Sequence, residues 1–386
     1  MSLYCLLISF ILSIIISLLS NKAIIYCNIK KHNIIADKIR NLGLCGQRKK
    51  EGTPTFGGIS IIISTLIPTF FFSQLNNIYV LMLISTTLWM GAIGVIDDYI
   101  KIKYNKKGLN GIFKILGQLI LGIFIGCTMY FNRNITIIDN AKVNIINNYT
   151  NDNSTKKIHC LKTTCPIFFR NDELDYTSIM TYYNKTWYKY TWIIFVPIIM
   201  LLIVFMSNSA NLSDGLDGLT SGVSSIIVIT LFLFTCFSSH KFYHKHSHFM
   251  CITNIEEIMI FSISLLGALI GFYWYNAYPA QIFMGDTGSL TIGSVLAVIS
   301  IFLRKELLFP VIFGIFFVEN ISVVIQVLFF KFYKTMYGIE KRIFLMSPIH
   351  HHFQKLGYHE NKIVNRFCII QIILSSLIIF YLINAQ

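Results

Sequence analysis

Long apolar stretches recur along the chain and are separated by polar segments rich in Lys, Asn, Asp and Gly. Each stretch is long enough to cross a hydrocarbon core of about 30 Å. In lipid such a stretch must be helical, because its backbone groups can be satisfied only internally. The pattern predicts about ten membrane-spanning helices, near residues 3–20, 57–73, 78–96, 112–131, 192–208, 219–237, 256–274, 288–304, 307–330 and 364–383. We therefore expect an all-α polytopic membrane protein, with residues 1–386 forming one integral-membrane domain.

The polar connections alternate in character. The loops 21–55, 97–111 and 331–363, which follow odd-numbered spans, are rich in Lys and Arg. The positive-inside rule places such loops in the cytoplasm. Because the number of spans is even, both termini would then lie on the outer side.

Composition supports this interpretation. The chain has 386 residues, of which 54% are hydrophobic and 13% charged, and its mean hydropathy is +0.63. A soluble domain of this length needs more polar surface. The net charge of +14 could indicate nucleic-acid binding. However, Lys and Arg flank the apolar spans instead of forming one basic face, so we expect a lipid bilayer and no nucleic acid as partner.

Two of the outer connections are unusual. Segment 132–191 is long, rich in Asn and without clear periodicity, and we interpret it as an expanded outer loop. A second connection carries His240, His244, His246 and His248. A His-rich tract can bind metal, but an incidental polar loop is the simpler interpretation.

Four polar motifs lie in odd-numbered loops or at the span ends beside them. Asp97 and Asp98 end the third span, where two adjacent carboxylates are costly unless they serve a function. They could hold a divalent cation or accept a proton. Alternatively, they form a helix-end acidic pair that is offset by Lys101 and Lys103.

The second motif, at 208–218, contains Asn211, Ser213, Asp214 and Asp217 with glycines that permit close approach of a ligand. An Asx/Gly turn is the alternative, although such a turn does not need two acids and two asparagines at membrane depth. The third motif runs from Asn276 through Phe283 to Asp286 and Ser289. It suits a metal-binding carboxylate followed by helix amides that meet a phosphate.

The fourth motif is His350, His351 and His352. Successive histidines cannot share one helical face, so a facial zinc site is not expected. Held in a loop, they could donate to a phosphate or shuttle a proton. Lys50 precedes a Gly/Thr/Pro run, and Lys114 lies inside the fourth span, where snorkelling is the alternative.

Within the ninth span, Glu319 and Gln326 are seven residues apart and share a helix face. Acids, amides, Lys and His, without a Ser or Cys nucleophile motif, suit a magnesium-assisted transfer on phosphates. Loop parity places all these motifs on the cytoplasmic face.

The segments GTPTFGG, IDDY, NLSDGLDG, NAYPAQIFMGDTGSL and MSPIHHHF resemble, in order and spacing, the signatures of the bacterial phospho-N-acetylmuramoyl-pentapeptide transferases. The resemblance extends from about residue 36 to the C-terminus. It implies a ten-helix enzyme of the bacterial inner membrane with periplasmic termini. Such an enzyme transfers phospho-N-acetylmuramoyl-pentapeptide from its UDP derivative to undecaprenyl phosphate, with Mg²⁺ as cofactor, and gives lipid I and UMP for peptidoglycan synthesis.

The resemblance also implies roles for individual residues. Asp286 would be the magnesium ligand, Asp97 and Asp98 would serve the lipid phosphate, with one as base, and His350 and Lys114 would lie near the diphosphate. Asn211 and Asp214 would also bind substrate. The nucleoside pocket would be lined by Lys50, Gly215, Leu216, Asp217, Asn276 and Phe283. The sugar or peptide end of the donor would meet Gln326, His351 and His352.

The chain departs from the family pattern in places. Phe56 stands where Met is usual and Ser213 where Thr is usual, and the periplasmic loop 132–191 and the stretch 331–342 are lengthened. Direct attack by the lipid phosphate is expected, although a two-step route through an aspartyl intermediate remains open, as does a homodimer. The alternative functions are transfer from UDP-GlcNAc to a polyprenyl phosphate and, because of Glu319, membrane transport.

Overall fold

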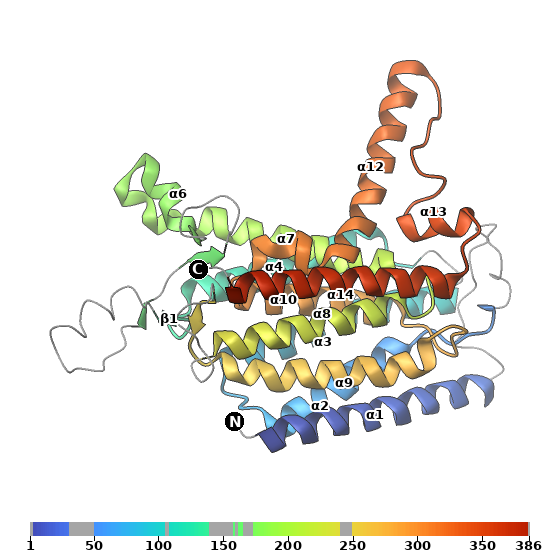
Figure 1. Ribbon diagram of the computed structural model, residues 1–386, viewed down its shortest axis with the longest axis horizontal. Helices are drawn as coiled ribbons and strands as arrows, with labels where there is room; N and C mark the ends of the chain where they lie inside the picture. The colour runs from blue at the N-terminus through green and yellow to red at the C-terminus, as the bar shows by residue number, and fades with distance from the viewer. Residues whose placement is uncertain are drawn as a thin grey trace.

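The computed structural model describes residues 3–30, 50–104, 108–138, 157–158, 161–164, 173–239 and 249–384. Over these residues the protein is a bundle of long helices (Figure 1). The bundle helices are α1 (Leu3–Lys30), α2 (Gly57–Phe72), α3 (Ile78–Tyr104), α4 (Gly111–Phe131), α7 (Trp192–Ser213), α8 (Leu219–Ser238), α9 (Ile258–Asn276), α10 (Gly285–Phe302), α12 (Gly314–Tyr337) and α14 (Glu360–Asn384).

The predicted multi-pass architecture is confirmed. Nine helices in the described ranges are long and apolar enough to cross a membrane, and α2 is a shorter apolar helix of 16 residues. The N- and C-terminal ends of the chain lie at the same end of the bundle, as an even number of crossings requires (Figure 1).

The first helix shows how the sequence adapts to a lipid environment. Its buried positions are polar, and four of the five recur every four residues, at Ser9, Ser13, Ser17 and Asn21, with Asn28 as the fifth. The Ser13 hydroxyl lies 2.8 Å from the carbonyl oxygen of Ser64 in α2 and 2.6 Å from that of Ser264 in α9. Its apolar side chains face outward instead. Small polar residues inside and large apolar residues outside are typical of helices packed within a membrane.

The centre of the bundle is α10. Every residue from Thr287 to Phe302 is buried, and the helix packs against α2, α3, α7 and α8. The approach to α2 is so close that a Cβ added at Gly58 would lie 2.6 Å from the Cα atom of Gly288. The start of α10 is thus fixed from several sides, which matters because Asp286 lies in its first turn.

The ninth predicted span is broken. A short helix, α11 (Phe309–Ile312), is separated from α12 by Phe313. Gln371 of α14 satisfies backbone groups at this break. Its side chain donates to the Ile312 carbonyl at 2.8 Å and accepts the Ile315 N–H at 3.2 Å. Beyond the break α12 projects away from the bundle, and the chain returns to α13 (Ile349–Lys355) (Figure 1).

Small elements cover the end of the bundle that holds the termini (Figure 1). The strands are β1 (Ile137–Ile138), β2 (Lys157–Ile158), β3 (Lys162–Thr164), β4 (Glu173–Asp175) and β5 (Cys251–Ile252). β1 pairs with β2 and β5, and β3 pairs with β4, all antiparallel. β4 is followed by α6 (Tyr176–Tyr183) and the 3-10 helix η2 (Lys185–Tyr190). Two further 3-10 helices, η3 (Ile255–Glu257) and η4 (Glu306–Leu308), begin the α9 and α11 segments.

The described parts of segment 132–191 therefore lie opposite α13, away from the predicted chemistry. The His-rich tract 240–248 lies outside the described residues. One local expectation was wrong, because the three histidines do not lie in a loop but begin the helix α13. Pro348 precedes this helix, and a Pro at the start of a helix removes no intrahelical hydrogen bond.

Candidate active site

Three carboxylates from two helices meet at the end of the bundle nearest α13. Asp97 and Asp98 come from the last turns of α3, and Asp286 from the first turn of α10. One oxygen atom of each lies within 4.8 Å of the others. Asp97 and Asp98 are buried, whereas the Asp286 side chain retains 14% of its exposure. The sequence placed these residues in separate motifs, and the structure brings them together.

Asp98 caps the start of α10. Its Oδ1 accepts the Asp286 N–H at 3.1 Å, and its Oδ2 accepts the Thr287 N–H at 2.9 Å and the Thr287 hydroxyl at 2.7 Å. The first amides of a helix have no intrahelical acceptor, and a carboxylate there is favoured by the helix dipole. Met284, the residue before α10, makes no such side-chain bond. Gly285 has a φ of +71°, and a Cβ there would lie 2.5 Å from Asp98 Oδ2.

Two lysines neutralise the cluster. Lys101 Nζ lies 2.8 Å from Asp97 Oδ2, 3.4 Å from Asp98 Oδ1 and 2.9 Å from Asp286 Oδ1. Lys114 Nζ lies 3.0 Å from Asp97 Oδ2 and forms a short contact with Asp286 Oδ2. Lys114 is therefore a component of the site and not merely a snorkelling side chain. Lys101, which the sequence suggested only as an offsetting charge, contacts all three acids.

The end of α7 adjoins this cluster. Asn211 Nδ2 donates to the Ser289 hydroxyl of α10 at 2.9 Å. Asp214, which follows α7, is half-buried. Burial and the charges of Asp286 and Asp98 raise the pKa of Asp214 to about 7. A carboxyl group that titrates near neutral pH is characteristic of functional sites.

A second charged cluster joins three separate segments. Lys50 Nζ lies 2.7 Å from Asp217 Oδ1 and 2.8 Å from Glu360 Oε2. Burial acts to lower the pKa of Lys50, but the charges of Asp217 and Glu360 outweigh it and hold that pKa above its usual value. Asp217 Oδ2 also accepts the Ala280 N–H at 3.0 Å. The loop before α2, the turn before α8 and the start of α14 are therefore tied together.

The turn before α10 is held by backbone pairing. Phe283 N–H donates to the Pro54 carbonyl at 2.8 Å, and the Phe283 carbonyl accepts the Gly57 N–H at 2.9 Å. Asn276 Oδ1 accepts from the Ser221 hydroxyl at 2.8 Å, while its Nδ2 donates to the Ile282 carbonyl at 3.0 Å. Asn276 thus has a clear structural role, and the Phe283 side chain is half-buried.

His350 lies over the turn that follows Asp214. Its Nδ1 is 3.0 Å from Glu319 Oε2, and both side chains are fully buried. A Cβ added at Gly215 would collide with His350 Nε2, so this nitrogen faces the turn. It has no hydrogen-bond partner within the described residues. Leu216 is buried next to Gly215. Glu319, the feature that favoured a transporter, is therefore a partner of His350.

The other two histidines have different neighbours. His351 Nδ1 lies 2.7 Å from Gln354 Oε1. His352 Nδ1 accepts the Leu345 N–H at 3.1 Å. Gln326 Oε1 accepts the Phe344 N–H at 2.9 Å. His352 and Gln326 thus fix the segment that leads into α13.

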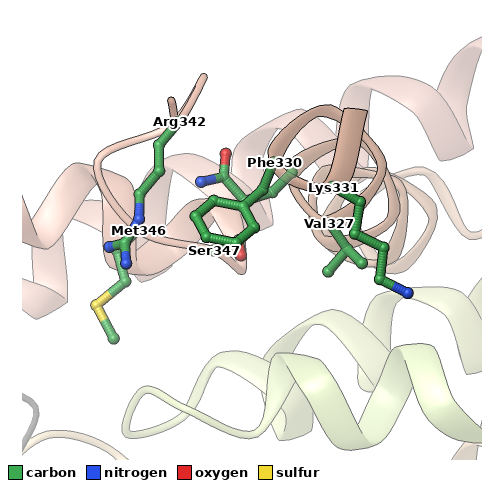
Figure 2. Close-up of a pocket in the computed structure, with 7 residues that line it drawn as sticks. Val327, Phe330, Lys331, Arg342, Met346 and Ser347 are labelled. Carbon is green, nitrogen blue, oxygen red and sulfur yellow. The ribbon is translucent and has the colours of Figure 1, made fainter. Parts of the chain in front are cut away.

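A cavity of about 390 Å³ lies between α12 and the returning segment. Its lining residues are Gln326, Val327, Phe330, Lys331, Arg342, Met346 and Ser347. Figure 2 shows the Phe330 ring in the middle, with Arg342 on one side and Lys331 on the other. The cavity therefore has an apolar wall and basic side chains at its edge.

The donor set of the acidic cluster fits a hard divalent cation. Carboxylate oxygens are the ligands that Mg²⁺ prefers, and Asp97, Asp98 and Asp286 each offer one oxygen within 4.8 Å of the other two. In the structure the ammonium groups of Lys101 and Lys114 balance these negative charges. Positive charge beside carboxylates at the start of a helix also suits a phosphate ligand.

Sequence reasoning missed Lys101, Gln354 and Glu360 as site residues. Lys101 lies one helical turn after Asp97, so extending the third helix beyond residue 96 would have placed it on the same face. Glu360 offered a weaker signal, since an acid in the first turn of a helix is common for electrostatic reasons alone.

Comparison with known proteins gives a consistent result. Residues 80–304 match the family model described as glycosyl transferase family 4. A phospho-N-acetylmuramoyl-pentapeptide-transferase of Flavobacterium psychrophilum is 48% identical over 95% of this chain and 90% of its own length. Proteins of the same name from Amoebophilus asiaticus and Flavobacterium johnsoniae are 47% and 45% identical. The alignments cover 95% and 96% of this chain, and 90% and 91% of those proteins, respectively.

Proposed function

Since the chain belongs to glycosyl transferase family 4 and, within it, to the phospho-N-acetylmuramoyl-pentapeptide-transferases, we propose that it makes lipid I for peptidoglycan synthesis. The donor is UDP-N-acetylmuramoyl-pentapeptide, the acceptor is undecaprenyl phosphate, and UMP is released. The observation that carries this proposal is the meeting of Asp97, Asp98 and Asp286 with Lys101 and Lys114 at one end of the bundle. Such a cluster suits two negatively charged phosphate groups that must approach each other.

The transfer is a direct displacement. An oxygen of the lipid phosphate bonds to the β-phosphorus of the donor, while the bond between that phosphorus and the bridging oxygen breaks. UMP leaves with the bridging oxygen and its electron pair. Lys101 and Lys114 are placed to offset the charge of the phosphates, since both ammonium groups lie among the acids.

Asp97 is the better candidate for the group that takes a proton from the acceptor phosphate. The two oxygens of Asp98 are already engaged by the first amides of α10 and the Thr287 hydroxyl. Asp97 accepts one backbone hydrogen bond, from Leu109 N–H at 2.6 Å, and its other oxygen faces the lysines. Asp98 then acts by positioning Asp286.

Asp286, with Asp97 and Asp98 beside it, would hold the Mg²⁺. A bound Mg²⁺ would neutralise charge on the phosphate oxygens and help to orient them. Asp286 is the most exposed of the three carboxylates and therefore the most accessible to a metal–phosphate complex.

The donor occupies the other half of the site. Lys50 and Asp217, joined by an ion pair, lie with Gly215, Leu216, Asn276 and Phe283 in the turns that hold the nucleoside. Asn211 and Asp214 lie between these turns and the acids. His350 and His351 face the diphosphate and sugar, and Gln326 and His352 shape the wall beside them.

The acceptor reaches the site from the bilayer of the bacterial inner membrane. The cavity between α12 and residues 342–347 combines an apolar wall with Lys331 and Arg342 (Figure 2). An apolar surface with a basic edge suits a lipid that carries a phosphate.

The experiment is a donor comparison with purified protein in detergent. Undecaprenyl phosphate and Mg²⁺ are mixed with UDP-N-acetylmuramoyl-pentapeptide or with UDP-GlcNAc, and UMP is measured. We expect UMP and a lipid-linked product from the first donor only. UMP from UDP-GlcNAc alone would indicate the related GlcNAc-1-phosphate transferases, and no UMP from either donor would refute transferase activity.

A further inference from the structure

A chain of hydrogen bonds runs from the start of α14 to the middle histidine of α13. Gln354 Nε2 donates to Glu360 Oε1 at 2.9 Å. Gln354 Oε1 lies 2.7 Å from His351 Nδ1. At its other side, Glu360 accepts from Lys50 with both oxygens, at 2.9 Å and 2.8 Å. Gln354 takes no part in the chemistry described above, and Glu360 enters it only as a partner of Lys50.

The direction of each bond follows from the chemistry of its groups. Both oxygens of Glu360 accept from the Lys50 ammonium group, and a carboxylate bound in this way can only accept further hydrogen bonds. The Gln354 side chain must therefore turn its NH₂ group toward Glu360 and its carbonyl oxygen toward His351. A carbonyl oxygen also can only accept, so the proton of His351 must lie on Nδ1.

We propose that Glu360 is a positioning residue which, through Gln354, fixes His351 in the tautomer with its proton on Nδ1. His351 Nε2 is then a hydrogen-bond acceptor for an N–H or O–H group of the donor substrate. This proposal rests on the proposed function for the identity of the donor.

The surroundings of His351 support this assignment. Burial and the neighbouring His350 lower the pKa of His351 to about 4, so the ring is neutral at pH 7. A neutral ring has one protonated nitrogen, which makes the choice of tautomer meaningful. The rings of His350 and His351 are 4.1 Å apart between centroids. His351 is therefore next to the residue that faces the Gly215 turn, on the donor side of the site.

Exchanging the carboxylate and the amide between positions 354 and 360 distinguishes an effect passed on through hydrogen bonds from an effect of simple packing. Glu360→Gln keeps the shape but allows the Gln354 amide to turn over, which removes the preference for one tautomer. The double variant Gln354→Glu with Glu360→Gln places the carboxylate directly against His351 Nδ1 and restores the preference. Both residues of the pair keep side chains of the same length in every variant.

The test combines kinetics with ¹⁵N NMR of histidine-labelled protein in detergent, in which a His351→Asn spectrum identifies the His351 signals. We expect Glu360→Gln to raise the donor KM about 10-fold, the effect of one polar hydrogen bond, with the acceptor KM unchanged within about two-fold. The His351 signals should change from one tautomer to a mixture. The double variant should restore the Nδ1–H signal, and with it the part of the donor KM that does not depend on the lost ion pair between Lys50 and Glu360.

Glu340→Gln is the matched control, because Glu340 also pairs with a lysine, at 2.8 Å from Lys334, but is exposed and outside the network. It should alter neither measurement. An unchanged tautomer in Glu360→Gln, a double variant without recovery, or a parallel loss of thermal stability and both KM values would overturn the proposal. If the wild-type protein releases no UMP, the proposed function fails, while the NMR comparison still tests the relay.

Discussion

The carboxylate of Asp98 accepts the backbone N–H of Asp286 at 3.1 Å, although the two residues are 188 positions apart. One acid of the cluster therefore sets the position of another. Because Asp98 also accepts from Thr287, it replaces the cap that α10 lacks in its own sequence. Asp97 and Asp98, which look equivalent in the sequence, thus have different roles.

This difference predicts different effects of the same substitution. Asp98→Asn should lower the free energy of unfolding by about 1–2 kcal/mol, because an amide replaces only part of the cap. Asp97→Asn should leave thermal unfolding in detergent closer to the wild type but reduce kcat by at least about 100-fold, the contribution of a general base. Equal losses of stability in the two variants would contradict the assignment.

Asp286→Asn should abolish transfer at any practical Mg²⁺ concentration. The substitution removes the most exposed carboxylate of the cluster, so that less negative charge remains beside the ammonium groups of Lys101 and Lys114. The measurement is UMP release across a Mg²⁺ titration, with Glu340→Gln as control. Near-normal turnover of the Asp286→Asn variant would exclude this residue as the metal ligand.

Gly58→Ala should destabilise the protein, because the new methyl group would meet the Gly288 backbone at the contact of α2 with α10. Overpacking of this kind costs about 1–3 kcal/mol. Gly111→Ala is the matched control, since nothing lies within 4 Å of a Cβ at that position. Thermal unfolding in detergent compares the two variants. Similar thermal midpoints would show that α2 and α10 can move apart without a loss of stability.

Asp214 predicts a pH dependence of stability. Its pKa is raised from the usual 3.8 to about 7 in the folded protein. Between these values the folded state keeps a proton that the unfolded state has lost, so stability falls as the pH rises toward 7 and is constant above it. Asp214→Asn should remove this loss. The thermal midpoint of the variant should exceed that of the wild type at about pH 8 but not at about pH 4.

The helices could be predicted because lipid imposes one simple rule on their length and composition. Their polar ends could not. The third span was predicted to end near residue 96, yet α3 continues to Tyr104, since Asp97 and Lys101 find partners along the same helical face. The short helix α13 was missed for a similar reason, as His350 is held by a contact with Glu319 of α12.

The candidate site shows the same division. The motifs identified most of the residues, because adjacent acids, a Gly-rich turn and a His triplet are unusual beside apolar spans. The pairings could not be predicted, since Lys50 with Glu360 joins positions 310 residues apart. Such contacts depend on how α2, α8 and α14 pack, which hydrophobic periodicity does not specify.

The burial of α10 has a consequence for drug resistance. A change that shifts Asp286 must also disturb the packing of α10 against four other helices. Substitutions that let a cell escape an inhibitor of this site should therefore arise at its half-exposed rim, at residues such as Phe283 and His351, while the acids themselves stay invariant.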